Sequence, residues 1–343
     1  MPMRSRWSIR HPLRQFMASD HFRPLMRKYP WAQAHLTRRA RRLRQDPNET
    51  GGTSDAAYCL FVWHHHLKFI TRSFPDFRPG HILEIGPGDT VGVGLSALMS
   101  GAESYTGVDA HRYLNLDLTR RHAGEIHDLL VEHQAQGKRP SLGEQELAPL
   151  PPDVLDRFLA RQTGTQDSAE TYDAGQRLNY LSPVTPPRIS TVLPEARFDL
   201  CMSQAVLEHV DAPDVAYQAM FRALKPGGVF SHEIDFRSHQ TSYDWNGHWV
   251  YSDRQWRIAQ NNMTFTYINR LPLSAHLDLI KAAGFRVLTV SPAKQASDIS
   301  RGHLAARWKH LSQEDLETAG AHILAEKPDT TAQRPSCKGF CET

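Results

Sequence analysis

The chain has 343 residues, of which 40% are hydrophobic and 22% are charged, and its formal net charge is +3. These values are ordinary for a globular domain, and no segment reaches the roughly 20 consecutive apolar residues that a membrane-spanning helix needs. The amino-terminal residues lack the apolar stretch of a secretory signal and the four cysteines form no disulfide framework, so we expect a cytoplasmic protein.

Residues 1–80 are predicted to form a basic, helical extension. Residues 1–50 hold twelve lysine or arginine residues against three acidic ones. Such charge is either a solvated helix face or a surface for anions such as phospholipid head groups or a phosphate-bearing substrate. For residues 1–45 we predict peripheral contact with anionic membranes. We expect no nucleic-acid partner, because no aromatic platform or nucleic-acid fold signature accompanies the charge.

Residues 55–74 have the apolar spacing of a helix, and prolines follow it directly. Within this segment, three consecutive histidines, His64, His65 and His66, raise the question of a metal site. Neighbouring helix residues point about 100° apart, so three in a row cannot share one ion. We therefore interpret them as packing and surface histidines and expect no metal ion.

Short apolar strands alternate with helices from residue 81 onwards, which is the pattern of a doubly wound α/β fold with a mostly parallel sheet. The expected strands cover residues 81–85, 104–109, 178–181, 198–203, 229–234, 285–290 and 322–326. The expected helices between them cover residues 90–100, 211–224, 273–283 and 312–319. Together they form one domain over residues 81–328, and residues 329–343 are expected to be disordered.

A helical insertion, residues 112–176, is predicted after the second strand. It is polar, it is helical at residues 119–134 and 153–162, and it has too few large apolar residues for a core of its own. Because it begins just after the carboxyl end of a strand, we expect it to form a lid over the acceptor side of a cleft. Residues 236–270, rich in Trp, His, Asn and Tyr, are expected to form a substrate-side loop.

A glycine turn follows the first strand. Gly86, Pro87 and Gly88 let a ligand approach the backbone at the start of a helix. Glu84, two residues before the first glycine, can hold the ammonium of an amino-acid cofactor. Asp109 ends the second strand, where it can accept hydrogen bonds from both ribose hydroxyls of a nucleoside. The turn alone would also fit a nicotinamide or flavin dinucleotide, so the cofactor stays open on these residues.

Two further segments narrow the choice: residues 198–210, from Phe198-Asp199-Leu200 to Glu208-His209-Val210, and the turn at residues 224–228. With the glycine turn, their order and spacing resemble class I S-adenosylmethionine-dependent methyltransferases over residues 80–328, apart from the insertion. The usual acid near the adenine is not evident after residues 178–181. The resemblance implies a seven-stranded Rossmann-like sheet that binds S-adenosyl-L-methionine. Its expected cofactor-binding residues are Glu84, Gly86, Pro87, Gly88, Asp109, Ser203 and Gln204.

The downstream half resembles uncharacterised methyltransferase-domain proteins associated with bacterial surface-polysaccharide and glycoconjugate gene clusters. This resemblance rests on residues 231–239, 245–249, 268–272 and 311–316. It implies a small-molecule acceptor, a hydroxyl of a sugar or of a lipid-linked glycan. Aromatic rings beside amides and charged groups suit a carbohydrate ring. The predicted substrate-binding residues are Trp245, Asn246, His248, Trp249, Asn269 and Arg270.

Transfer to a hydroxyl needs a base, and histidine is the usual choice near neutral pH. His239 is the first candidate, because it follows the fifth strand at its carboxyl edge, with Asp235 as its orienting partner. His209 is the second, with loop packing as its alternative role, and His232 is expected to point into the core. A divalent ion held by Asp235, His239 and His248 is a competing hypothesis, although their spacing matches no zinc motif.

Two other functions are compatible with a fold of this kind. A non-catalytic protein could retain the fold and bind S-adenosylmethionine without turnover, but the intact glycine turn and its two acids argue against a decayed site. A nucleotide-dependent oxidoreductase is the other alternative. Val91 argues against it, because this residue stands where a dinucleotide fingerprint has its third glycine.

Overall fold

The computed structural model describes residues 52–78, 80–137, 149–163, 171–239, 241–242, 244–262, 267–297 and 299–329. These residues form two compact units. The sheet unit takes its described residues from Asp46–Asp235, Leu273–Ala293 and Gly320–Thr343, and the small unit takes its own from Phe236–Pro272 and Lys294–Ala319. The predicted basic surface of residues 1–45 lies outside the described residues, as does all but residue 329 of the predicted tail.

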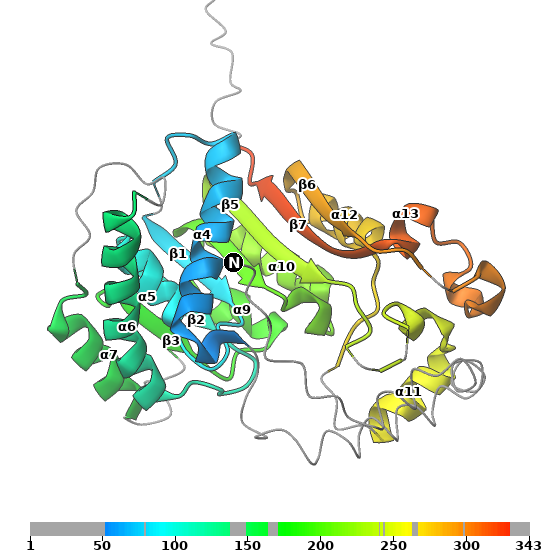
Figure 1. Cartoon of the computed structure of the whole chain (residues 1–343), viewed down its shortest axis with the longest axis horizontal. Coiled ribbons are helices and arrows are strands. Elements are labelled where there is room, and N and C mark those ends of the chain that lie inside the picture. Colours follow the sequence, from blue (N-terminus) through cyan, green and yellow to red (C-terminus); the bar gives the residue numbers. More distant parts are fainter. Residues whose placement is uncertain are drawn as a thin grey trace, which may run out of the picture. The chain divides into compact units, whose positions relative to one another are not determined.

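A seven-stranded sheet forms the centre of the sheet unit, with the strand order β3-β2-β1-β4-β5-β7-β6 (Figure 1). The first five strands pair in parallel, and β7 runs antiparallel to β5. The predicted doubly wound, mostly parallel α/β fold is therefore confirmed. The strands are β1 (His81–Ile85), β2 (Ser104–Val108), β3 (Leu178–Leu181), β4 (Phe198–Gln204), β5 (Leu224–Asp235), β6 (Arg286–Lys294) and β7 (Thr318–Glu326).

Two strands begin earlier than predicted. β5 starts at Leu224 because this residue already pairs with Phe198, and the register shifts before the regular ladder begins. The predicted helix over residues 312–319 is wrong in its second half, because α13 ends at Leu316 and β7 begins at Thr318. The backbone N–H of Phe236, the residue after β5, donates a hydrogen bond to the carbonyl of Ala319 and so extends the ladder between β5 and β7.

Helices cover both faces of the sheet (Figure 1). One layer contains α4 (Ala56–Ser73), α5 (Gly92–Met99), α6 (Leu116–Ala135) and α7 (Pro152–Thr163). The other contains α9 (Pro186–Val192), α10 (Pro213–Ala223) and α12 (Leu273–Ala282). The sequence did not predict α9, because its two leading prolines read as a loop. Proline fits the first helical turn, however, since its missing N–H would have no partner there.

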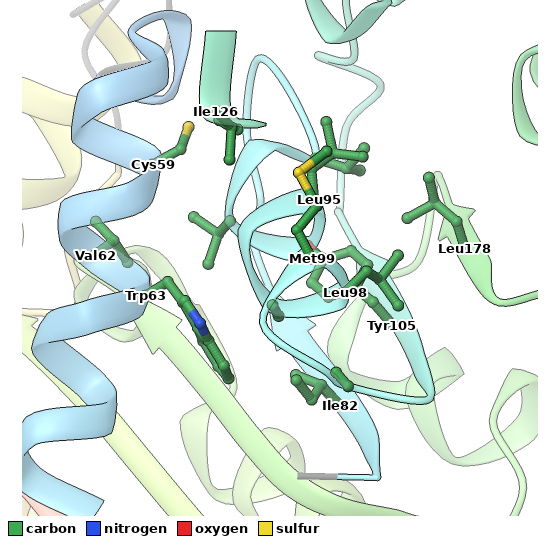
Figure 2. Close-up of a cluster of buried hydrophobic side chains, with 14 of the residues drawn as sticks. Cys59, Val62, Trp63, Ile82, Leu95, Leu98, Met99, Tyr105, Ile126 and Leu178 are labelled. Carbon is green, nitrogen blue, oxygen red and sulfur yellow. The ribbon is translucent and has the colours of Figure 1, made fainter. Parts of the chain in front are cut away.

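The largest core lies between the first helix layer and the sheet (Figure 2). Trp63 of α4 is fully buried, and its Nε1 donates a hydrogen bond to Ser100 Oγ at 3.1 Å. All of α5 is buried, and a Cβ at Gly94 would lie 2.5 Å from Tyr105 Cδ1, so only glycine lets α5 approach β2 this closely. Side chains of α6 and α7 belong to the same core. Both helices of the predicted insertion thus belong to this layer, and the lid over an acceptor stays a prediction.

The small unit has two buried clusters of its own, one around Trp249 and Trp308 and one around Tyr251 and Trp256. Its helical segments are η3 (Gly247–Val250), α11 (Asp253–Asn262), η4 (Arg301–His303), η5 (Ala306–Trp308) and α13 (Gln313–Leu316). The predicted loop over residues 236–270 was therefore wrong where α11 forms, because this helix carries too few apolar residues to show a periodic pattern. None of the helices in the described part of the chain is both long and apolar enough to cross a membrane.

Candidate cofactor and active site

The strand order reverses between β1 and β4: β2 and β3 lie on one side of β1, and β4 and β5 on the other. Doubly wound sheets bind ligands at such a reversal, outside the carboxyl ends of the strands. The glycine turn follows β1, Asp109 follows β2, Gln204 ends β4 and Asp235 ends β5. The fold therefore brings the predicted cofactor-binding residues and Asp235 to one edge of the sheet.

The glycine turn needs its glycines for conformational reasons. Gly86 and Gly88 have φ angles of +72° and +76°, a region that side chains other than glycine rarely adopt. A Cβ at Gly86 would also lie 2.6 Å from Val206 Cγ2, in the segment that follows β4. The backbone N–H of Gly86 donates to the carbonyl of Val108 at 2.8 Å, which ties the turn to the end of β2.

Asp109 lies directly against this turn. Its Oδ2 accepts a hydrogen bond from the backbone N–H of Gly88 at 3.1 Å and one from the hydroxyl of Tyr180 at 3.3 Å. The side chain is only 7% exposed. Burial raises the pKa of Asp109 well above its ordinary value, and the hydrogen bonds from Gly88 and Tyr180 oppose this shift. The acid after β2 is thus held in place by the turn after β1.

Glu84 is the most buried acid of the site, at 1% exposure, and it accepts a hydrogen bond from the hydroxyl of Tyr105 in β2. Burial raises the pKa of Glu84 to about 7, and the bond from Tyr105 opposes the shift. A cationic group beside this carboxyl would favour its ionised form. The sequence did not single out Tyr105 or Tyr180, because an aromatic residue in a buried strand reads as ordinary core.

Thr53, in the short helix η1 (Gly52–Ser54), also fixes the turn. Its Oγ1 accepts a hydrogen bond from the backbone N–H of Asp89 at 3.0 Å, and its carbonyl accepts one from Thr90 Oγ1 at 2.7 Å. The segment before α4 therefore closes on the loop that leads into α5. Sequence reasoning missed this contact, because it joins segments that lie far apart in the chain.

The two predicted residues at the end of β4 have different surroundings. Ser203 is fully buried, and its Oγ lies 2.6 Å from His232 Nδ1 in β5. Burial lowers the pKa of His232 well below its ordinary value, so this histidine is neutral and in the core as expected. Gln204 is half-buried and pairs in register with Glu233. Of the two residues, Gln204 is therefore the better placed to contact a ligand.

Glu208 links two of the predicted catalytic residues. It lies in η2 (Leu207–His209), where its carboxylate is 3.8 Å from His209 Nε2. Burial raises the pKa of Glu208 well above its ordinary value, and hydrogen bonds with the backbones of Glu208 itself and Asp235 oppose the shift. The structure thus places Glu208, which the sequence analysis did not consider, near the His209 ring and the backbone of Asp235.

The remaining predicted residues belong to the small unit. His239 is half-buried and has a φ of +45°. Trp245 is half-buried and its Nε1 donates to the carbonyl of Ala296 at 2.9 Å. Asn246 is fully buried, and its Nδ2 donates to Ser297 Oγ and to the carbonyl of Leu316. Asn246 therefore joins η3 to the end of α13.

Three of the other four predicted residues, His248, Trp249 and Arg270, lie together, and Arg270 is only 6% exposed. Arg270 donates to the carbonyl of Tyr251 and to Asp253 Oδ1, and its guanidinium stacks on two tryptophan rings. Trp249 donates from Nε1 to the carbonyl of Arg270. His248 packs on Trp249, and burial lowers its pKa well below the ordinary value, with the charge of Arg270 adding to the shift.

Asn269 is half-buried, and its Oδ1 accepts a hydrogen bond from the backbone N–H of Leu271 at 3.0 Å. This bond holds the turn that positions Arg270. Contact of these small-unit residues with a substrate stays a prediction, as does the hypothesis of a divalent ion at Asp235, His239 and His248.

A family model described as a methyltransferase domain matches residues 63–290, from within α4 to within β6. A comparison with curated protein sequences finds no match. Among solved structures, the chain is similar to an S-adenosylmethionine-dependent methyltransferase from Mesorhizobium loti, with 12% identity, 76% of this chain and 96% of that chain covered, and a TM-score of 0.37. It is also similar to a SAM-dependent methyltransferase from Methanosarcina mazei, with 14% identity, 75% and 97% covered, and a TM-score of 0.40. Phosphoethanolamine N-methyltransferase 2 of Haemonchus contortus, in complex with S-adenosyl-L-methionine, has 16% identity, 78% and 53% covered, and a TM-score of 0.40.

Proposed function

The chain belongs to the methyltransferase-domain family, and on this premise we propose that it transfers a methyl group from S-adenosyl-L-methionine to a hydroxyl of a small acceptor. The observation that carries the proposal is the hydrogen bond from the backbone N–H of Gly88 to the carboxylate of Asp109. It joins the glycine turn after β1 to the acid after β2, the two features that a nucleoside cofactor needs side by side.

The residues at this edge of the sheet fit such a cofactor. Asp109 would accept hydrogen bonds from the ribose through Oδ1, because Oδ2 already accepts from Gly88 and Tyr180. Glu84 is a buried carboxyl suited to an ammonium group, and Gln204 lies at the neighbouring strand end. The remaining predicted contacts are Gly86, Pro87 and Ser203. S-adenosyl-L-methionine, when bound, supplies a methyl group on a positively charged sulfonium.

For the acceptor, we propose a hydroxyl of a sugar or of a lipid-linked glycan. Trp245 and Asn269 support this class, because both are partly exposed and offer an aromatic face and an amide, the groups that carbohydrate sites use. The buried residues Asn246, His248, Trp249 and Arg270 would act mainly by holding the small unit in shape. The wider resemblance of the downstream half to glycoconjugate-associated proteins adds to the same proposal.

His239 is our proposed general base, which would take the proton from the acceptor hydroxyl as the methyl group is transferred. Asp235 would orient it. His209 is the next candidate, supported by its contact with the buried carboxylate of Glu208. The protein would otherwise act by holding the acceptor hydroxyl in line with the methyl group of the cofactor, because correct positioning of two bound reactants supplies much of the rate.

The test is a binding comparison followed by an activity screen. Calorimetry should detect S-adenosylhomocysteine binding to the full chain and none of NAD at the same concentration. Labelled S-adenosylmethionine should then label a component of lipid-linked glycan, nucleotide-sugar or free glycan pools from a cell extract. Binding of NAD alone would refute the proposed cofactor. Binding of S-adenosylhomocysteine without transfer to any pool would favour a non-catalytic binding protein.

A further inference from the structure

Three side chains from separate elements of the sheet unit converge on the face of the sheet that α4 covers. They are His65 of α4, Glu233 of β5 and His322 of β7, and one ligand atom from each lies within 4.8 Å of the others. His65 Nε2 is 3.6 Å from Glu233 Oε2, and His322 Nδ1 is 3.3 Å from the same oxygen. A tetrahedral zinc ion with bonds of about 2.0–2.2 Å separates its ligand atoms by about 3.3–3.6 Å. The separations of 3.6 Å and 3.3 Å match this spacing.

His64 and His66, the neighbouring histidines of α4, have different surroundings, and the ring of His66 also lies beside that of His322, with centroids 4.9 Å apart. His64 packs against His133, with ring centroids 5.8 Å apart, and His66 Nδ1 lies 2.8 Å from Ser231 Oγ. His64 is therefore directed away from the three side chains, whereas His66 lies beside them through His322 and Ser231. The position that the sequence could not identify as a ligand is His65, because both of its partners come from strands far along the chain.

The surroundings of His322 orient its ring for metal binding. Its side chain is 2% exposed, and the ring of Phe69 stacks on it at 4.0 Å. His322 Nε2 lies 3.0 Å from Ser231 Oγ, which also contacts His66. If Nδ1 of His322 binds an ion, its Nε2–H donates to Ser231 Oγ, and the Ser231 hydroxyl can donate to His66. Outer contacts of this kind fix the tautomer and orientation of metal-binding histidines.

The chemistry of the three groups also suits an ion. A neutral imidazole offers a metal ion the lone pair of one ring nitrogen, and Nδ1 of His322 is the nitrogen that faces Glu233. A carboxylate at Glu233 would supply negative charge. The side chains of His65 and Glu233 are 29% and 25% exposed, which leaves a path for an ion and room for a water molecule. Two imidazoles and one carboxylate with an open position are a donor set that Zn²⁺ commonly uses.

We propose that His65, Glu233 and His322 bind one divalent transition-metal ion, with Zn²⁺ the best match, and that a water molecule completes its coordination. This site is separate from the hypothesis of an ion at Asp235, His239 and His248, and it does not depend on the proposed methyl transfer. It lies beside the end of β4, because Glu233 pairs in register with Gln204.

The test uses the untagged full chain after removal of metal with a chelator, in a Cys337→Ser/Cys341→Ser background so that thiolates of the tail cannot bind the ion. Calorimetry with Zn²⁺ should give one site per chain. Co²⁺ should give the visible absorption of a four-coordinate ion with nitrogen and oxygen ligands. Absence of Zn²⁺ binding to the folded chain would overturn the proposal.

Variants locate the site. His65→Ala and Glu233→Gln are chosen because both side chains are partly exposed, and each should weaken Zn²⁺ binding more than 100-fold. Ser231→Ala should weaken it about 10- to 100-fold through loss of ring orientation. His64→Ala is the matched control, because His64 is the sequence neighbour of His65 but its ring packs against His133. This variant should bind Zn²⁺ as tightly as the parent does. Unchanged affinity in both His65→Ala and Glu233→Gln would overturn the assignment, whatever the parent binds.

Discussion

Asp109→Ala should weaken binding of S-adenosylhomocysteine by about 1–3 kcal/mol, which is about 5- to 150-fold in Kd. The carboxylate is 7% exposed, so water screens its hydrogen bonds only weakly. Oδ2 is already occupied by Gly88 and Tyr180, so the bonds lost with the ligand are those that Oδ1 would make to the ribose. Loss of the anchor on Gly88 N–H adds to the effect by loosening the glycine turn.

Calorimetry at neutral pH measures this change, and thermal unfolding of the same variant separates lost binding from a lost fold. Because burial raises the pKa of Asp109, its replacement should not unfold the chain at neutral pH. Tyr180→Phe is the matched control, since it removes one hydrogen bond to Oδ2 and keeps the carboxylate. It should cost at most about 1 kcal/mol of binding. Equal affinity of Asp109→Ala and the parent would refute the role of Asp109.

Three further changes test other parts of the site. His239→Ala should cut turnover by about 10²–10⁴-fold and leave S-adenosylhomocysteine affinity unchanged; turnover near the parent's, insensitive to chelator, would leave His209 as the candidate base. Removal of residues 1–45 should leave cofactor binding intact and weaken sedimentation with anionic vesicles, and equal sedimentation would reject the membrane contact. Burial raises the pKa of Glu84 from 4.5 to about 7, so between these pH values the folded chain keeps a proton on Glu84 that the unfolded chain has lost. The stability of the folded chain should therefore fall as the pH rises from 4.5 to about 7. Glu84→Gln should flatten this part of a Tm-against-pH curve, and an unchanged curve would count against a buried, protonated Glu84.

The sequence predicted the sheet well because its signals are local. Parallel strands buried on both faces appear in the sequence as short apolar runs. The turn has positive φ angles at Gly86 and Gly88, and the glycines themselves mark these positions in the sequence. The tyrosines that bind Glu84 and Asp109 could not be predicted in this way. Tyr105 and Tyr180 lie in neighbouring strands, and only the register of the sheet brings their hydroxyls to the two acids.

The small unit was harder to predict because its order comes from tertiary contacts. Asn246, Trp249 and Arg270 looked like exposed ligand-binding groups in a segment without periodicity. In the folded unit they are buried, and each makes hydrogen bonds to backbone carbonyls of other segments. Such bonds satisfy buried polar groups, and a sequence pattern does not distinguish this use of an amide or guanidinium from substrate binding.

The electrostatics of the glycine turn separate the two cofactor classes that its backbone could accept. Asp109 suits both, because a ribose occurs in S-adenosylmethionine and in a dinucleotide. Glu84 does not, because it is a second acid beneath the same turn and burial raises its pKa to about 7. A pyrophosphate bound at the turn would bring more negative charge toward this carboxyl and oppose its ionisation. An ammonium group would instead favour the ionised form of Glu84, which burial disfavours in the free protein, and would then be attracted to that carboxylate. Together with Val91 in place of a third glycine, this charge balance favours an amino-acid-bearing nucleoside over a nicotinamide dinucleotide.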